Sequence, residues 1–374
     1  MKYAFELGHQ PHISEAEIRT VLTKRLGISF VAIGQKNNFF IIETKTTFDA
    51  TSCMHILGGT ISINEYIADA DNAETFIPDL IETQEGKIKF SIKSSNKRLG
   101  ITIKKELKNR NRSVRYVEPK NTATIIHNNL VETKSNFIEI GKELYRTVAV
   151  QNIEAFTERD YHRPQADDKS GMLPPKLARI MINLSGVSPE KNTLLDAFCG
   201  SGTVLIEAID LGFKKIIGSD LSKKAVQDST ENIQWFEKNH SLTDVSYSLH
   251  YCDATHTSSI VKKDSIDVLV SEPYLGKPLN GRETKEFLAS QASELRELYT
   301  ASFKEFKKIL KKDARVIFII PQFKYQDEWI VPECIGDIEK AGFALEPLSQ
   351  KEETLLYHRP GQFVGRKIVQ FVTL

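Results

Sequence analysis

A strand, a glycine-rich turn and a helix start follow one another within residues 194–208, and this feature constrains the fold more than any other. The apolar strand ends at Asp196, and Gly200 and Gly202 then let the backbone turn tightly and approach a ligand closely. A helix that begins at Thr203 would present the positive end of its dipole to that ligand. The segment therefore predicts a nucleotide-cofactor site in an α/β domain, with an ordinary strand, turn and helix as the alternative interpretation.

The acidic residues at the predicted strand ends favour a cationic cofactor. A dinucleotide fingerprint would need a third glycine where this chain has Leu205, and a carboxylate at Asp196 is unfavourable beside a pyrophosphate. S-adenosylmethionine carries a sulfonium and an ammonium group, so carboxylates suit it better. The next two strands lead to Asp220, expected to hold the ribose hydroxyls, and to Asp253, expected to bind the adenine amino group. The predicted cofactor-binding residues are Asp196, Phe198, Cys199, Gly200, Gly202, Thr203, Asp220, Leu221, Asp253 and Ala254.

The apolar run 266–270 predicts a fourth strand, whose end carries the predicted reaction centre. Open α/β sheets bind ligands beyond the carboxyl ends of their strands, so this tip would lie beside the cofactor. A proline stiffens the backbone there, and a tyrosine offers an aromatic face. The predicted catalytic residues are Ser271, Glu272, Pro273 and Tyr274.

These motifs together resemble those of the class I methyltransferases that methylate exocyclic amines. The resemblance is carried by residues 196–203, Asp220, Asp253, Pro273 and Tyr274. The fourth-strand motif of that family reads Asp/Asn-Pro-Pro-Tyr/Phe, and this chain has Ser271 and Glu272 in place of its first two residues.

Two flanking parts of the sequence are similar to THUMP-containing tRNA guanosine methyltransferases. One comprises residues 159–164 and 171–178, and the other comprises residues 357–362 and 366–368. The resemblance implies S-adenosylmethionine as cofactor and tRNA as substrate. It also implies transfer of one or two methyl groups to the exocyclic N2 amine of a guanosine near the D-arm.

The predicted catalytic residues suit this reaction, because an exocyclic amine is a poor nucleophile that has to be oriented. Acceptors at the strand tip would hold its N–H groups so that the nitrogen lone pair points at the methyl group. The candidate acceptors are the Ser271 hydroxyl, the Glu272 carbonyl and the Glu272 carboxylate. The base would have to leave its helix and stack on Tyr274.

Two alternatives stay open from the sequence. In the first alternative, the chain is a methyltransferase for another planar amine, such as adenine in DNA or a glutamine side chain. In the second, it is an RNA-binding protein whose methyltransferase domain has lost activity. The second alternative is motivated by Ser271 and Glu272, whereas the intact cofactor motifs weigh against it.

A basic segment stands out from an otherwise balanced chain. Residues 85–120 contain twelve Lys or Arg and three Asp or Glu, a local net charge of +9, although the whole chain carries only +1. Residues 101–110 have apolar side chains at helical spacing with lysines on the opposite face. A solvated helix face is the alternative to phosphate contacts. The predicted RNA-binding residues are Lys104, Lys105, Lys108, Arg110, Arg112 and Arg115.

Four regions are predicted along the chain. They are a ferredoxin-like domain at 1–68 with β-α-β-β-α-β order, a THUMP-like α/β RNA-binding domain at 69–155, a linker at 156–172, and a methyltransferase domain at 173–374. The last should be Rossmann-like, with a seven-stranded, mostly parallel sheet that is covered by helices and closed by an antiparallel strand. Within it, residues 327–341 are expected to be largely helical.

Composition limits the remaining possibilities. With 374 residues, of which 40% are hydrophobic and 26% charged, the chain can bury large cores. No segment reads as a membrane span or a signal peptide, and four single cysteines offer neither a disulfide framework nor a metal site. We therefore expect no metal, no membrane, a cytoplasmic location and a monomer. The sequence carries no signal that decides whether a small activating subunit takes part.

Overall fold

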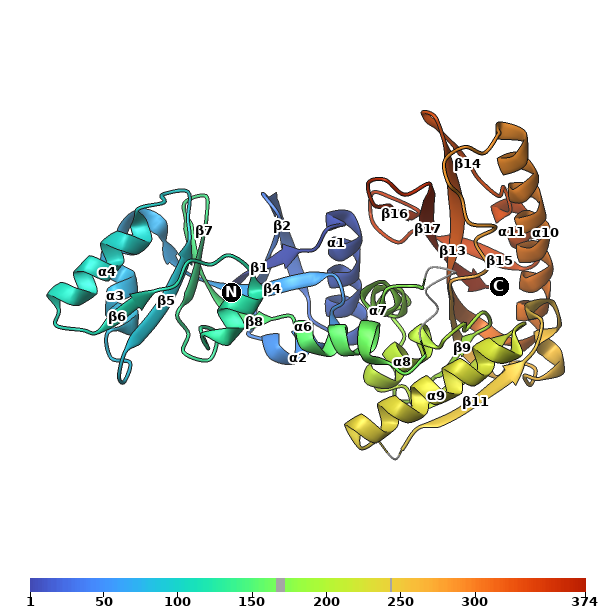
Figure 1. Ribbon diagram of the computed structural model, residues 1–374, viewed down its shortest axis with the longest axis horizontal. Coiled ribbons are helices and arrows are strands. Elements are labelled where there is room, and N and C mark those ends of the chain that lie inside the picture. The colour runs from blue at the N-terminus through green and yellow to red at the C-terminus, as the bar shows by residue number, and fades with distance from the viewer. Residues whose placement is uncertain (166–171, 243) are drawn as a thin grey trace. The chain divides into compact units, whose positions relative to one another are not determined.

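The computed structural model describes residues 1–165, 172–242 and 244–374 (Figure 1). They form two compact units, residues 1–18 with 26–153 and residues 19–25 with 154–374. The predicted linker at 156–172 includes residues 166–171, which lie outside the described residues.

The first unit is built on one eight-stranded sheet of order β2-β3-β1-β4-β8-β7-β5-β6. Its strands are β1 (Lys2–Leu7), β2 (Phe30–Lys36), β3 (Phe39–Thr44), β4 (Thr60–Asp69), β5 (Ile88–Lys93), β6 (Val114–Tyr116), β7 (Asn136–Ile140) and β8 (Glu143–Val150). The helices of this part of the chain are α1 (Pro11–Thr20), α2 (Ala50–Ile56), η2 (Ala70–Asn72), α3 (Ala73–Ile81), α4 (Leu99–Asn109) and α5 (Thr122–His127). The predicted β-α-β-β-α-β order of the first six elements is confirmed.

A buried row of polar side chains crosses this sheet. Thr147 on β8 donates to Asn64 Oδ1 on β4 at 2.6 Å, Asn136 on β7 donates to Thr147 at 2.7 Å, and Ser91 on β5 donates to Asn136. Buried polar groups need such partners, so the row favours one register for four strands. Because β4 pairs with β8, the sheet continues through both predicted N-terminal regions. Their division at residues 68 and 69 stays a prediction.

The second unit contains a nine-stranded sheet whose main path runs β11-β10-β9-β12-β13-β17-β15. Its strands are β9 (Thr193–Asp196), β10 (Lys215–Asp220), β11 (Ser246–Tyr251), β12 (Ile266–Ser271), β13 (Leu310–Tyr325), β14 (Glu328–Ile330), β15 (Phe343–Glu346), β16 (Leu355–Tyr357) and β17 (Val364–Thr373). The first five strands of the path are parallel, and β17 is antiparallel to both neighbours. The predicted seven-stranded, mostly parallel sheet is confirmed, and the short strands β14 and β16 pair in addition with β13 and β17.

Two groups of helices cover this sheet. Its helices are η1 (Val21–Arg25), α6 (Ile153–Thr157), η3 (Glu158–His162), α7 (Pro175–Leu184), α8 (Thr203–Asp210), α9 (Lys223–His240), η4 (Ala254–Ser259), α10 (Lys285–Ile309) and α11 (Ile335–Lys340). Helices α7, α8 and α9 pack in sequence, and α10 packs on η4 and α11. Successive residues 268–271 of β12 are all buried, as expected for a parallel strand covered on both faces.

The expectation of a largely helical segment at 327–341 is wrong. Gln326 has φ +52° and turns the chain so that β14 pairs back on β13 as a hairpin. Pro332 follows and has no backbone N–H to donate to a helix, so only the six residues of α11 are helical. Hydrophobic periodicity does not distinguish such a short hairpin from a helix start.

Candidate active site

Asp196 lies at the carboxyl end of β9, and only 2% of its surface is exposed. Its Oδ1 atom accepts hydrogen bonds from the Ser271 hydroxyl at 2.7 Å and from the Phe198 amide at 3.2 Å. Burial raises the pKa of Asp196 to about 7, against the effect of these two hydrogen bonds, and the nearby charges of Asp220 and Glu272 raise it further. The carboxyl group therefore changes charge near neutral pH.

The glycines of the turn after β9 are required by backbone geometry. Gly202 has φ +87°, and a Cβ atom there would lie 2.5 Å from the Ser229 hydroxyl on α9. Gly200 has φ +52°, yet a Cβ atom at this position would meet no heavy atom within 4 Å. The turn thus packs closely against α9 at one glycine and borders open space at the other. Such a cradle suits a ligand that approaches the backbone.

The Asp220 carboxylate ties the turn to the end of β10. Its Oδ2 atom accepts from the Gly200 amide at 2.9 Å, and its Oδ1 atom accepts from the Ser222 amide at 2.8 Å. The next side chain, Leu221, is 65% exposed. Asp253 follows β11 and caps η4, because its Oδ1 atom accepts from both the amide and the hydroxyl of Thr255 at 2.8 Å.

Because β9, β10 and β11 are adjacent and parallel, their carboxyl ends meet at one edge of the sheet, where the structure brings Asp196, Asp220 and Asp253 together. Three acidic side chains around a turn with open space fit a ligand that carries positive charge, ribose hydroxyls and an amino group. The chemistry of S-adenosylmethionine matches this donor and acceptor set. The role of each residue toward it stays a prediction.

The tip of β12 lies next to β9, and its side chains already have partners within the protein. Ser271 is fully buried, and its hydroxyl accepts from the Ala197 amide at 3.0 Å while it donates to Asp196. Arg366 Nε on β17 donates to Glu272 Oε1 at 2.5 Å. Burial raises the pKa of Glu272, although the charge of Arg366 opposes this shift. In this structure both side chains hold the strand tip in place.

Tyr274 is the exposed group at this tip, with 54% of its surface accessible. Its carbonyl accepts from the Tyr299 hydroxyl on α10 at 2.6 Å, and Pro273 before it is buried. Gln291 on α10 accepts from the Lys277 amide at 2.8 Å and so holds the following loop. A fixed backbone with an exposed ring is suited to stacking on a planar group.

Sequence reasoning did not identify the residues that support the site from a distance. Tyr299, Gln291 and Arg366 act on the β12 tip from elements that come later in the chain. Arg163 is also buried and donates to the Thr203 hydroxyl at 2.7 Å, at the first turn of α8. Arg163 and Arg366 carried a signal, because each lies in one of the two flanking parts of the sequence on which the family resemblance was based.

The basic segment places its cations unequally. Lys105, Lys108 and Arg115 are exposed and Lys104 is half-buried. Arg110 instead forms ion pairs at 2.6, 2.8 and 2.9 Å with three carboxylates, and Arg112 donates to the Gln84 carbonyl. The three carboxylates belong to Asp79, Glu82 and Glu106. These contacts occupy two of the six predicted RNA-binding side chains, so Lys105, Lys108 and Arg115 are the ones that face solvent.

Two negative findings apply to residues 1–165, 172–242 and 244–374. No group of three or more His, Cys, Asp or Glu side chains is arranged there to hold a metal ion. Within the same residues, no helix is long and apolar enough to cross a membrane.

Comparisons with known proteins agree with this geometry. A family model described as an RMKL-like methyltransferase domain matches residues 162–331, and a model described as a DNA methylase matches residues 27–232, more than half of the chain. A solved structure of TrmN from Thermus thermophilus superposes with a TM-score of 0.54 at 13% identity and covers 100% of both chains. At this identity the superposition shows the fold alone.

Two archaeal relatives are tRNA (guanine(10)-N2)-dimethyltransferases. That of Methanothermobacter thermautotrophicus is 34% identical over 161 residues, which cover 41% of this chain and 44% of the relative. That of Methanocaldococcus jannaschii is 30% identical over 141 residues, which cover 36% and 38%. The chain thus spans less than half of the length of these two relatives. From its strand order, its cofactor turn and the matching family models, the chain belongs to the class I methyltransferases, whose cofactor is S-adenosylmethionine.

Proposed function

We propose that this protein transfers a methyl group from S-adenosylmethionine to the exocyclic N2 amine of a guanosine in tRNA. The observation that carries the proposal is the exposed ring of Tyr274, which is held on a fixed backbone at the tip of β12. This tip lies next to the ends of β9, β10 and β11 with Asp196, Asp220 and Asp253, which we call the acidic cofactor edge. The names of the two archaeal relatives support guanosine N2 and tRNA.

The acidic edge would bind and orient the cofactor, which when bound supplies an electrophilic methyl group. Asp196 would face its positive charge, Asp220 its ribose hydroxyls and Asp253 its adenine amino group. The carboxylates of Asp220 and Asp253 also accept backbone amides, so their orientation is fixed before a ligand arrives. Fixed acceptors lose little freedom on binding, which favours affinity.

The β12 tip would orient the amine. A flipped guanine stacked on Tyr274 would place its N2 atom near the Glu272 carbonyl, and the carboxylate of that residue would hold the tip through Arg366. Orientation of the amine lone pair toward the methyl group needs acceptors rather than a strong base. Ser271 would then have an indirect role, because its hydroxyl fixes the position of the Asp196 carboxyl group.

The exposed cations of the basic segment would bind the phosphates of the tRNA. Lys105, Lys108 and Arg115 are accessible, and phosphate contacts supply most of the sequence-independent affinity for a nucleic acid. A THUMP-like role for residues 69–155 belongs to the same proposal, as do a monomeric state and a cytoplasmic location. The four free, buried cysteines support a reducing compartment.

The test is incubation of the purified protein with labelled S-adenosylmethionine and an unmodified tRNA transcript, followed by nucleoside analysis. We expect label in N2-methylguanosine or N2,N2-dimethylguanosine, and its loss in Tyr274→Ala with unchanged cofactor affinity. Duplex DNA and a glutamine peptide serve as parallel substrates, because one family model describes a DNA methylase. Label in either of these and not in tRNA would overturn the proposal, and no label anywhere would favour an RNA-binding protein without activity.

A further inference from the structure

A cavity of about 470 Å³ opens in the second unit, apart from the acidic cofactor edge. Its walls come from the loop between β12 and α10 at residues 281–283, the end of β13 with the first turn residue at 324–326, and the loop between β16 and β17 at 361–363. Leu288 on α10 completes the lining. We call this cavity the flank pocket. None of the predicted cofactor-binding or catalytic residues contributes to it.

The flank pocket lies beyond the carboxyl ends of the parallel strands, where the predicted reaction centre also lies. Strand β13 is parallel to β12, with Ser271 opposite Phe318, and it continues for six further residues to Lys324. At ~3.3 Å per residue the pocket is displaced by about 20 Å along the strand direction from the β12 tip. The loop that starts at Tyr274 leads from the tip to residues 281–283. An RNA strand whose base stacks on Tyr274 can therefore extend along this loop into the pocket.

The pocket carries a net positive charge. Arg282 and Lys324 both line it, both are exposed, and neither side chain forms an ion pair with the described residues. Glu283 is the acidic residue in the lining, and its carboxylate accepts from the amides of Asn280 at 2.7 Å and Gly281 at 2.9 Å. The carboxylate thus stabilises its own turn, and the two cations are available to an anion.

A second, independent observation points to a ligand. The Oε1 atom of Gln362 is buried and has no hydrogen-bond partner. An unpaired buried acceptor costs folding free energy, so a ligand that donates an N–H group to it would be favoured. The loop that carries Gln362 is fixed, because its carbonyl pairs with the His358 ring at 2.9 Å and its amide donates to the Arg359 carbonyl at 3.1 Å.

An aromatic face stands beside this acceptor. The Phe363 side chain is 40% exposed, and its carbonyl accepts from the Lys324 amide at 2.9 Å. Gly281 packs directly on the ring, since a Cβ atom there would lie 2.4 Å from a ring carbon. The ring is thus held in place while part of it remains accessible. Two cations, a buried acceptor and an aromatic face are together the groups that recognise a nucleotide.

We propose that the flank pocket binds a nucleotide of the substrate RNA that flanks the methylated guanosine. Arg282 and Lys324 contact its phosphate, Phe363 stacks on its base, and Gln362 Oε1 accepts a hydrogen bond from a base N–H group. This inference rests on the proposed function in one respect, namely that the substrate is RNA. The pocket positions the strand and takes no part in the methyl transfer.

The charge arm of the test uses the double variant Arg282→Gln, Lys324→Gln on the full chain with an unmodified tRNA transcript. We expect its Kd and its KM to rise by at least tenfold while kcat and cofactor affinity stay unchanged, because binding on a non-reacting nucleotide is uniform binding. The slope of log affinity against log salt should fall by about 0.7 for each lost phosphate contact. The matched control is Lys312→Gln, which removes an exposed charge near the opposite end of β13 and should change neither quantity.

The acceptor arm uses Gln362→Leu. Removal of an unpaired buried acceptor should leave the melting temperature unchanged or raise it, whereas loss of one hydrogen bond to the base should raise the Kd for RNA about 2- to 13-fold. Opposite signs for stability and binding identify a ligand-facing group, because a purely structural glutamine would lower both. Phe363→Ala should weaken RNA binding without altering cofactor affinity.

The outcomes separate the pocket from the reaction. If the wild-type protein is active and all of these variants keep its RNA affinity and KM, the proposed role of the flank pocket is overturned. The proposed function is not affected by that outcome. Weakened RNA binding in the variants, with no methylation by the wild type, would keep the pocket and overturn the reaction. Absence of RNA binding by the wild type would overturn both.

Discussion

The Ser271 hydroxyl donates a hydrogen bond to Asp196 Oδ1 at 2.7 Å and so joins the tip of β12 to the tip of β9. The same hydroxyl accepts from the Ala197 amide at 3.0 Å, and the Ser271 side chain is fully buried. This contact favours the charged form of Asp196, whereas burial favours the neutral form and raises the pKa to about 7. The serine that departs from the family motif is thereby coupled to the cofactor edge.

Cofactor binding should depend on pH through Asp196. The carboxyl group is charged above its pKa of about 7 and neutral below it, and the charged form attracts a cationic ligand. Affinity for S-adenosylmethionine should therefore rise as the pH increases through 7. Calorimetric titrations on both sides of pH 7 measure this effect. The same titrations of Asp196→Asn are the control, because any pH dependence that remains in this variant comes from other groups, such as the ligand's own amino group. An identical pH profile in the two proteins would exclude Asp196 as the cause.

Asp220→Ala should weaken cofactor binding. A charge-assisted hydrogen bond is worth about 1.5–3 kcal/mol, so we expect a loss of about 13- to 160-fold in affinity. The variant also loses the acceptor for the Gly200 amide, which loosens the turn. The control is Asp244→Ala, because that carboxylate is 87% exposed and pairs only with Lys214 in the described structure. Equal affinities of the two variants, measured by calorimetry, would remove Asp220 from the site.

Glu272 and Arg366 should behave as one unit. If the carboxylate holds the strand tip through the ion pair, then Glu272→Gln, Arg366→Gln and the double variant should lower turnover by similar factors, because each breaks the same contact. If the carboxylate instead binds the amine, only Glu272→Gln should lower turnover strongly, by about 13- to 160-fold. Single-turnover methylation of tRNA by the three variants distinguishes these roles. A double variant with additive losses would argue against coupling.

Neutralisation of Lys104, Lys105 and Lys108 should lower affinity for tRNA. Each phosphate contact that is lost should flatten the salt dependence of binding by about 0.7–0.9, while cofactor affinity stays the same. Arg110→Gln is the contrasting variant, because its side chain is paired with three carboxylates, and we expect no change in the salt slope. An unaltered slope in the triple lysine variant would mean that this helix face is only solvated.

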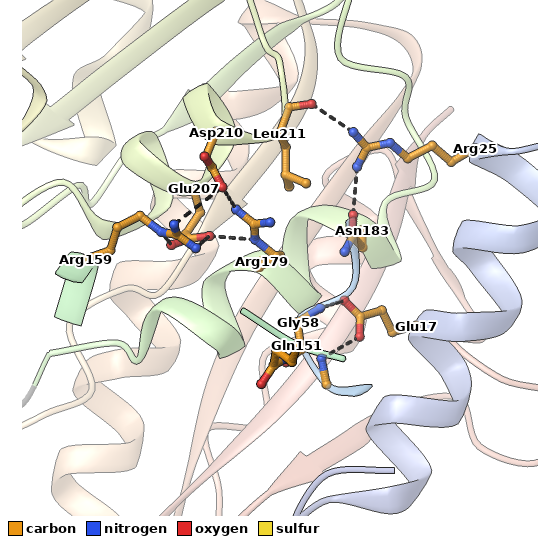
Figure 2. Close-up of polar contacts among 11 residues, drawn as sticks. Glu17, Arg25, Gly58, Gln151, Arg159, Arg179, Asn183, Glu207, Asp210 and Leu211 are labelled. Carbon is orange, nitrogen blue, oxygen red and sulfur yellow. Dashed lines mark hydrogen bonds and ion pairs between the residues drawn. The ribbon is translucent and has the colours of Figure 1, made fainter. Parts of the chain in front are cut away.

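Glu207→Gln should destabilise the second unit. Glu207 on α8 is fully buried and pairs with the buried guanidinium groups of Arg159 and Arg179, which also contact Asp210 (Figure 2). Removal of one partner leaves buried charge uncompensated and costs about 3–5 kcal/mol. Chemical denaturation measures the free energy of unfolding, and Glu328→Gln, which breaks a half-exposed ion pair with Lys285, should leave that free energy nearly unchanged. Comparable losses in the two variants would contradict this account of the network.

Local sequence determined the elements that carry the cofactor edge. Strand and helix periodicity, the two glycines with positive φ, and the acidic residues that end β9 and β10 are short-range features. Because parallel strands align their carboxyl ends, those features sufficed to predict that Asp196 and Asp220 meet. The short hairpin at 323–330 was not predictable in this way, since its pattern is too brief to separate from a helix start.

Tertiary structure alone decided which side chains are free to act. Ser271 meets Asp196 across 75 residues and Glu272 meets Arg366 across 94, and both contacts depend on strand order and on the packing around β12. Likewise, Thr147 meets Asn64 across 83 residues and helps to join two predicted domains through one sheet. Sequence patterns record the chemistry and the period of a segment, whereas the partner of a buried polar group is chosen only when distant segments pack together.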